Sequence, residues 1–294
     1  MKIIVMHNAP DWDAITSAWL LKRYFSGWQD ARYEFVAAGT RSKRSVTSAD
    51  IIEKIGEDEM IHVDTGLGPL DHHQTQDRNV SAASLTWDFV KSQIVGGKKW
   101  DEKQEAISRI VKVVVETDHF GEVYWADPTA DYHEFSLLGL LDGLKMEKPG
   151  DDSFAADFGM QCLDALLHNF ENRIWAEKEI QHNGKEFQTS FGKALGFETI
   201  NDDVLKLAQK MGYVLVVRKD PRKGYVRIKT LPEKAGDKGI DLTPVYEKLK
   251  AMDPQATWFL HVSKKMLLNG TTKNPDMKPT KLTLNEIIDV LQTL

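Results

Sequence analysis

Cysteine is nearly absent from this sequence: Cys162 is the single example among 294 residues, so no intrachain disulfide can form. Long apolar runs are also missing, and none approaches the roughly 20 residues that a membrane-spanning helix needs. We find no secretory signal peptide, because a charged residue near the start is followed at once by a strand-like segment. We therefore expect a soluble, cytoplasmic protein that does not enter a membrane.

An excess of positive charge is missing as well, since the net charge is −6 and the isoelectric point is near 5.9. Tight, nonspecific binding of long nucleic-acid duplexes requires a basic surface, so this class of function is disfavoured. Nucleotides and short oligonucleotides stay open as ligands. The composition is otherwise that of a globular protein, with 41% hydrophobic and 28% charged residues, and the length suits one large domain or two of moderate size.

The first 120 residues alternate between strand-like and helix-like segments. Strands are predicted at 2–6, 33–37 and 61–63, and helices after Asp13, at 49–55, from an N-cap at Ser81 to about Val95, and at 101–117. This alternation predicts an α/β domain with a mainly parallel sheet.

The second half of the chain has a different pattern. A break at 146–152 precedes a long helical pattern at 153–181, two strands at 213–218 and 225–230 joined by a turn, a strand at 258–262, and a final helix at 283–291. We therefore predict three parts: an α/β domain at 1–150, a helical connector at 151–185, and a smaller α+β domain at 186–294.

Metal-ligand side chains follow the apolar runs of the first part. His7, Asp11 and Asp13 come after the run at 3–6, Asp64 ends the run at 60–63, and the triplet Asp71-His72-His73 follows shortly. Parallel strands collect such side chains in one crevice, and burying them without partners is unfavourable. A pair of divalent cations is the natural partner for so many lone pairs.

Taken in order, these motifs resemble those of the DHH phosphoesterase superfamily. The resemblance rests on the run from His7 to Ala14, on Asp64, on Asp71-His72-His73 and on Ser81-Ala82-Ala83, and it covers the N-terminal half of the chain. The superfamily includes RecJ-like exonucleases, oligoribonucleases, cyclic-dinucleotide phosphodiesterases and family II pyrophosphatases. Only residues 65–70 separate Asp64 from the triplet, which resembles a short-spaced branch that includes a eukaryotic RNA exonuclease and argues against pyrophosphatase specificity.

The resemblance implies a role for each of these residues. His7 and Asp11 would bind a first metal ion, Asp13, His72 and Asp118 a second, and Asp64 would bridge the two. His73 would contact a phosphate oxygen or the leaving group, and Asp71 would orient a histidine. Asp127 and Asp131 compete with Asp118 for its role. Mn²⁺ is favoured over Mg²⁺ because the predicted ligands mix imidazole nitrogen with carboxylate oxygen.

A second candidate site follows the strand that begins at Trp258. Basic, polar and glycine residues there suit phosphate contacts: His261, Lys264, Asn269, Gly270 and Lys273. The superfamily carries a separate substrate-binding domain in a similar position, but this segment lacks its glycine-glycine-histidine pattern. A solvated basic loop is the alternative, as it is for the cluster of Arg41, Lys43 and Arg44.

Each element also has a purely structural interpretation. Asp11 and Asp13 suit helix caps, Asp64 suits a turn, and the triplet suits a solvated loop. Trp12, inside the first motif, suits either stacking on a base or a wall of the metal pocket.

As a whole, the pattern predicts a two-metal-dependent phosphoesterase acting on phosphodiester or phosphomonoester bonds of nucleotides or short single-stranded oligonucleotides. A 3′–5′ exonuclease is favoured, ahead of a mononucleotide phosphatase or a cyclic-dinucleotide phosphodiesterase. The alternative to an enzyme is a catalytically silent sensor that binds a nucleotide in the same cleft. The oligomeric state stays open.

Overall fold

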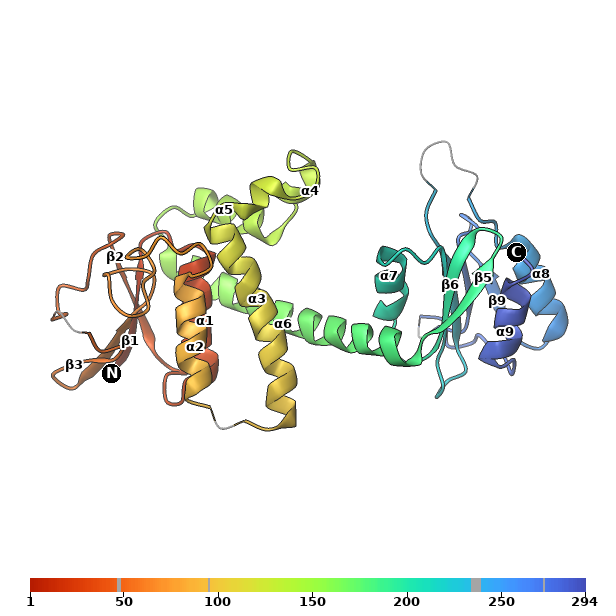
Figure 1. Cartoon of the computed structure of the whole chain (residues 1–294), viewed down its shortest axis with the longest axis horizontal. Coiled ribbons are helices and arrows are strands. Elements are labelled where there is room, and N and C mark those ends of the chain that lie inside the picture. Colours follow the sequence, from red (N-terminus) through yellow and green to blue (C-terminus); the bar gives the residue numbers. More distant parts are fainter. Residues whose placement is uncertain (47–48, 95, 234–238, 272) are drawn as a thin grey trace. The chain divides into compact units, whose positions relative to one another are not determined.

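The computed structural model describes residues 1–46, 49–94, 96–233, 239–271 and 273–294, and it shows an α/β protein (Figure 1). The chain divides into two compact units, Met1–Glu171 and Asn172–Leu294. Helix α6 (Asp152–Asn183) begins in the first unit and ends in the second. The predicted limits of the three parts stay predictions. In the part of the chain that the structure describes, none of the helices combines the length and apolar character that a membrane crossing requires.

The first unit contains a four-stranded sheet, which confirms the predicted mainly parallel sheet. Its strands are β1 (Lys2–His7), β2 (Arg32–Val36), β3 (Glu53–Ile55) and β4 (Asp58–His62), in the order β2-β1-β4-β3. Strand β1 pairs in parallel with β2 and β4, whereas β3 is antiparallel to β4. The apolar run at 3–6 is buried on both faces, as is typical of a central parallel strand.

The predicted helix at 49–55 is wrong, because its last three residues form strand β3. Gly56, with a φ of 63°, allows the chain to turn sharply between β3 and β4. The buried Glu53 side chain then accepts hydrogen bonds from Arg41 and Ser45. These contacts and the pairing with β4 override the local helical pattern.

Helices cover the sheet of the first unit (Figure 1). Helix α1 (Trp12–Tyr24) is buried from Trp12 to Leu21 and packs against α2 (Ala82–Ser92) and α3 (Lys98–Asp118). Ser81 is the N-cap of α2 as predicted; the helix ends at Ser92, and Val95 lies outside the described residues.

A set of shorter helices follows α3. They are the 3₁₀ helix η1 (Gly121–Tyr124), α4 (Asp131–Glu134) and α5 (Leu137–Glu147). The sequence interpretation missed α5, although the predicted break at 146–152 coincides with its end and the start of α6.

The second unit has a six-stranded mixed sheet, which confirms the predicted α+β architecture of this half. The strand order is β5-β6-β7-β8-β10-β9, and among these described strands β6 and β7 are the parallel pair. The strands are β5 (Lys185–Thr189), β6 (Gly192–Glu198), β7 (Leu215–Lys219), β8 (Val226–Thr230), β9 (Trp258–Leu260) and β10 (Met266–Asn269). Strands β5, β6 and β10 were not predicted.

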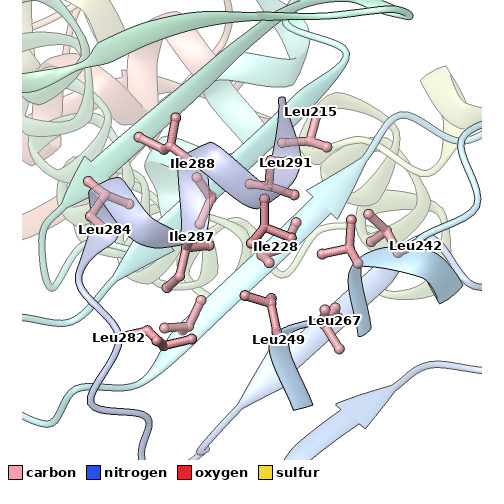
Figure 2. Packing of buried hydrophobic residues seen from close by; sticks show 14 of the residues in the cluster. Leu215, Ile228, Leu242, Leu249, Leu267, Leu282, Leu284, Ile287, Ile288 and Leu291 are labelled. Atoms are coloured by element: carbon pink, nitrogen blue, oxygen red, sulfur yellow. The ribbon is translucent and has the colours of Figure 1, made fainter. Parts of the chain in front are cut away.

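The described residues of the second unit also form the helices α7 (Asp203–Lys210), α8 (Thr243–Met252) and α9 (Leu284–Leu291). Helix α9, the predicted final helix, packs Leu284, Ile287, Ile288 and Leu291 together with Ile228 of the sheet (Figure 2). These spacings of three and four residues place the apolar side chains on one helix face.

Candidate metal centre

The carboxyl ends of β1 and β4 bring the first two candidate ligands together. The strands are parallel neighbours, so they end at the same edge of the sheet, where His7 closes β1 and Asp64 follows β4. His7 Nε2 lies 3.2 Å from Asp64 Oδ2. Residues that are far apart in the sequence thus meet because of strand pairing.

The loop after Asp64 brings the DHH triplet to the same edge. Asp64 has a φ of 54°, and its amide donates to Leu70 O at 3.0 Å, which closes the predicted turn. Gly66 has a φ of 81°, and Arg41 Nη1 donates to its carbonyl oxygen at 2.7 Å. A side chain at Gly66 would come within 2.9 Å of Arg41, so this position suits glycine.

Two carboxylates at the start of helix α1 make different contacts. Asp11, not Asp13 as the sequence suggested, is the N-cap, and its Oδ1 accepts from the amides of Asp13 and Ala14 at 3.0 Å each. The other oxygen, Asp11 Oδ2, lies 3.6 Å from His7 Nε2. Asp11 therefore both caps the helix and faces the site.

Asp13 is buried against the N-terminus of α2. Its carboxylate accepts from Ser81 Oγ at 2.6 Å, from Ala82 N at 2.7 Å and from Ala83 N at 2.8 Å. Amides at a helix N-terminus stabilise a carboxylate, so the Ser81-Ala82-Ala83 motif holds Asp13 in place.

The candidate ligands form two groups that share Asp64. One group consists of His7, Asp11 and Asp64. In the other, His72 Nε2 lies 3.5 Å from Asp64 Oδ1, 3.4 Å from Asp118 Oδ2 and 3.8 Å from Asp13 Oδ2. Asp64 presents Oδ2 to the first group and Oδ1 to the second, which is the arrangement of a bridging carboxylate.

Three buried atoms of the second group support cation binding. Asp64 Oδ1, His72 Nε2 and Asp118 Oδ2 have no hydrogen-bond partner among the described residues. Unpaired buried polar atoms are unfavourable, and a coordinated cation would satisfy all three. Carboxylate oxygens mixed with imidazole nitrogens suit Mn²⁺ better than Mg²⁺, so the residues present fit a pair of such ions.

The pKa values of the candidate ligands are shifted because several carboxylates lie close together. Burial and the neighbouring Asp64 and Asp118 hold the pKa of Asp13 well above its ordinary value, and burial likewise raises the pKa of Asp118. The Asp64 carboxylate, 3.5 Å from Nε2, is the main cause that raises the pKa of His72 to about 9. Burial acts to lower the pKa of His7, but hydrogen bonds with Asp11 and Asp64 outweigh it and raise the pKa to about 11. Without cations, the imidazoles therefore carry the compensating charge.

His73 and Asp71 form a tight pair beside the second group. Asp71 is buried, and its Oδ1 lies 2.7 Å from His73 Nδ1, while its Oδ2 accepts from Leu67 N at 2.7 Å. His73 is 56% exposed and lines the cleft described below. The position of the pair suits an orienting carboxylate and a substrate-facing imidazole, and these roles stay predictions.

The neighbours of Asp118 differ in position. Asp118 is the last residue of α3 and faces His72, whereas Asp127 and Asp131 are exposed and do not line the cleft. His119 Nε2 contacts Val80 O at 3.0 Å, and its ring lies edge-on to the His72 ring at 5.8 Å between centroids.

The predicted phosphate-binding loop belongs to the second unit. Asn269 is buried, and its amide donates to Thr257 O and Lys278 O while its Oδ1 accepts from Thr280 N. Gly270 has a φ of 78°, and a Cβ there would lie 2.0 Å from the Tyr225 ring. Both residues shape the loop itself, and their predicted contact with a substrate stays a prediction.

The charged members of that loop are placed differently. Lys264 Nζ binds Asp241 at 3.0 Å, His261 Nδ1 contacts Ser263 Oγ at 2.8 Å, and Lys273 is exposed. In the first unit, Arg44 of the other basic cluster binds Glu34 and Asp58.

A cleft of about 480 Å³ opens over the metal centre, and α5 forms part of its wall. Lys145 of α5 is the one lysine or arginine among its described lining residues, and Phe120, Leu138 and Leu141 contribute apolar surface. Sequence reasoning missed these residues. They belong to no motif, and the signal that could have found them is the apolar spacing of α5.

No family model and no curated protein matches this chain. Among solved structures it is similar to an uncharacterized protein from Helicobacter pylori G27, with 13% identity, 99% of this chain and 98% of the other covered, and a TM-score of 0.25. A pGpG-specific phosphodiesterase, PggH from Vibrio cholerae, matches with 15% identity, 98% coverage of both chains and a TM-score of 0.29. RecJ from Thermus thermophilus in complex with Mn²⁺ matches with 9% identity, 99% of this chain and 51% of the other covered, and a TM-score of 0.30. Such values carry no residue-by-residue correspondence, so the chemistry of the site follows from its own side chains.

Proposed function

We propose that this chain is a cytoplasmic, two-metal phosphoesterase of the DHH superfamily that hydrolyses phosphodiester or phosphomonoester bonds in nucleotides or short oligonucleotides. The observation that carries the proposal is the position of Asp64, whose two oxygens face two separate groups of ligands. The unpaired buried atoms of Asp64, His72 and Asp118 support it independently.

Each side chain has a defined task in this proposal. His7, Asp11 and Asp64 would bind one cation, and Asp13, Asp64, His72 and Asp118 the other. When bound, two such cations neutralise a phosphate and lower the pKa of a water molecule between them.

The remaining groups act around the metals. Asp71 holds His73 through Nδ1, which leaves Nε2 to contact the phosphate or its leaving group. Ser81 and the α2 amides hold the Asp13 carboxylate in place and aim it at the second group. No serine or cysteine nucleophile is needed.

Mn²⁺ is the favoured metal, and a 3′–5′ exonuclease on short single strands is the favoured activity. The dinucleotide pGpG, which appears in the name of the Vibrio cholerae phosphodiesterase, should be tested as a substrate together with the oligonucleotides. The alternative, a catalytically silent sensor, would bind a nucleotide in this cleft without turnover.

The test combines metal content with turnover. Purified protein should bind close to two Mn²⁺ per chain by mass spectrometry, and it should hydrolyse bis(p-nitrophenyl) phosphate or a member of a panel of nucleotides, dinucleotides and graded oligonucleotides. Asp64→Asn removes the bridging charge and should reduce turnover at least about 100-fold with the fold retained.

Asp127→Asn is the matched control, because Asp127 is an exposed aspartate outside the cleft lining. Full activity of Asp64→Asn would refute the assignment. Metal-loaded protein that binds nucleotides but hydrolyses none of the panel would identify the sensor instead.

A further inference from the structure

A second cavity, of about 220 Å³, adjoins the metal cleft. The two cavities share Trp12, Val114, Thr117 and Leu138 in their walls. We call the second cavity the annex. These four side chains lie between the two cavities, so the annex is next to the proposed active site.

The walls of the annex are almost entirely apolar. They come from α3, α5 and α6 and include Val113, Leu137, Leu163 and Phe170, together with Trp125. A phosphate or a sugar would lose hydration there without gaining partners. A flat apolar group fits, since aromatic and aliphatic walls favour it and the volume suits one ring system.

Trp12 lines both cavities and carries one unpaired polar atom. Its side chain is only 9% exposed, and its Nε1 has no hydrogen-bond acceptor among the described residues. A buried indole N–H without an acceptor is unfavourable, so an occupant with an acceptor on its ring edge would be favoured over a plain hydrocarbon.

We propose that the annex binds the nucleobase of the substrate while the phosphate lies at the metal centre. The inference rests on the proposed function and adds the place where the base of such a substrate binds. A planar ring with acceptors on its edge matches the apolar walls, the indole N–H and the volume. Few polar groups line the annex, so we expect it to bind every nucleobase. Inorganic pyrophosphate has no base, so the annex should add nothing to its affinity.

The test compares two ligands that differ only in the base. Adenosine 5′-monophosphate and ribose 5-phosphate are titrated calorimetrically into Mn²⁺-loaded protein, and each ligand is checked afterwards for intactness. The adenosine compound should bind about tenfold more tightly or better. Equal affinities in metal-loaded, hydrolytically active protein would overturn the annex proposal and leave the proposed function standing.

Filling the annex should remove the preference. Val113 lines the annex but not the metal cleft and is 39% exposed, so Val113→Phe adds a ring there at little risk to the fold. The affinity ratio of the two ligands should fall towards one. Val123→Phe is the matched control, since Val123 is exposed and lines neither cavity, and it should retain the ratio.

A second variant tests the indole N–H. Trp12→Phe keeps an aromatic wall but removes the donor, so affinity for adenosine 5′-monophosphate should fall about fivefold while affinity for phenyl phosphate, whose ring lacks acceptors, changes less. If both variants keep the wild-type ratio of affinities for adenosine 5′-monophosphate and ribose 5-phosphate, the annex is a packing void only. Protein that binds neither Mn²⁺ nor either ligand would refute the proposed function, and this inference with it.

Discussion

Ser81 Oγ donates a 2.6 Å hydrogen bond to Asp13 Oδ1, although the two residues are 68 positions apart. Both side chains are buried, and Asp13 also faces His72. The N-cap of one helix thus positions a candidate metal ligand on another.

Ser81→Ala should therefore weaken metal binding more than folding. Loss of a bond that orients a ligand typically reduces metal affinity by about 10- to 100-fold. Mn²⁺ titration calorimetry should show the weakening for one of the two ions. Ser92→Ala, at the other end of α2, is the control, because Ser92 Oγ donates to Phe89 O, away from the site. Equal Mn²⁺ affinity in Ser81→Ala and the control would contradict the positioning role.

Mn²⁺ binding should release protons. The pKa of His72 is raised to about 9 chiefly by the nearby Asp64 carboxylate, and the pKa of His7 is raised to about 11 because hydrogen bonds with Asp11 and Asp64 outweigh burial. Both rings are then protonated at about pH 7.5 in the metal-free protein, whereas a metal-bound imidazole nitrogen is not. Affinity should rise with pH up to at least about pH 9, and calorimetry in buffers of different ionisation enthalpy should detect about two protons released. Proton-independent binding would mean that the histidines are not ligands.

His62 should make stability depend on pH. Its side chain is 1% exposed, Ser42 N donates to its Nε2 at 3.1 Å, and its Nδ1 lies 3.0 Å from Glu53. Burial and the nearby charge of Arg41 lower its pKa from 6.5 to about 4. Between these values the unfolded chain binds a proton that the folded protein does not, so the free energy of unfolding falls as pH decreases from 6.5 to 4, by roughly 3 kcal/mol.

Urea unfolding with a chelator present, compared between the wild type and His62→Gln, checks this prediction. The site carboxylates titrate in both proteins, so the difference isolates His62. Parallel pH dependences would show that His62 titrates normally in the folded state.

Lys145 should bind the anionic substrate. It lines the cleft beside carboxylates, and no other lysine or arginine does so among the described residues. Lys145→Met should raise KM about tenfold with a smaller change in kcat, because a distant charge attracts the ground state and the transition state alike. Lys148→Met is the control, since Lys148 follows α5, does not line the cleft and lies over the Phe154 ring. Unchanged KM with unchanged metal content would place Lys145 outside the substrate site.

Many of the strands and helices can be predicted from local sequence patterns. The apolar run at 3–6 predicts a buried strand, and α9 shows its apolar face at spacings of three and four. Strand β3 was predicted as a helix, although it forms a tight hairpin with β4 across the turn at Gly56.

The sequence by itself determined which side chains lie at the carboxyl ends of β1 and β4, because an apolar run and the polar residues that follow it are local properties of the chain. Only the tertiary structure decided that Asp11 rather than Asp13 caps α1, that Asp64 turns one oxygen to each group, and that Lys145 and the annex adjoin the centre. The cap depends on the local backbone conformation at Asp11, whereas the other features depend on contacts between residues tens of positions apart, which no local periodicity encodes.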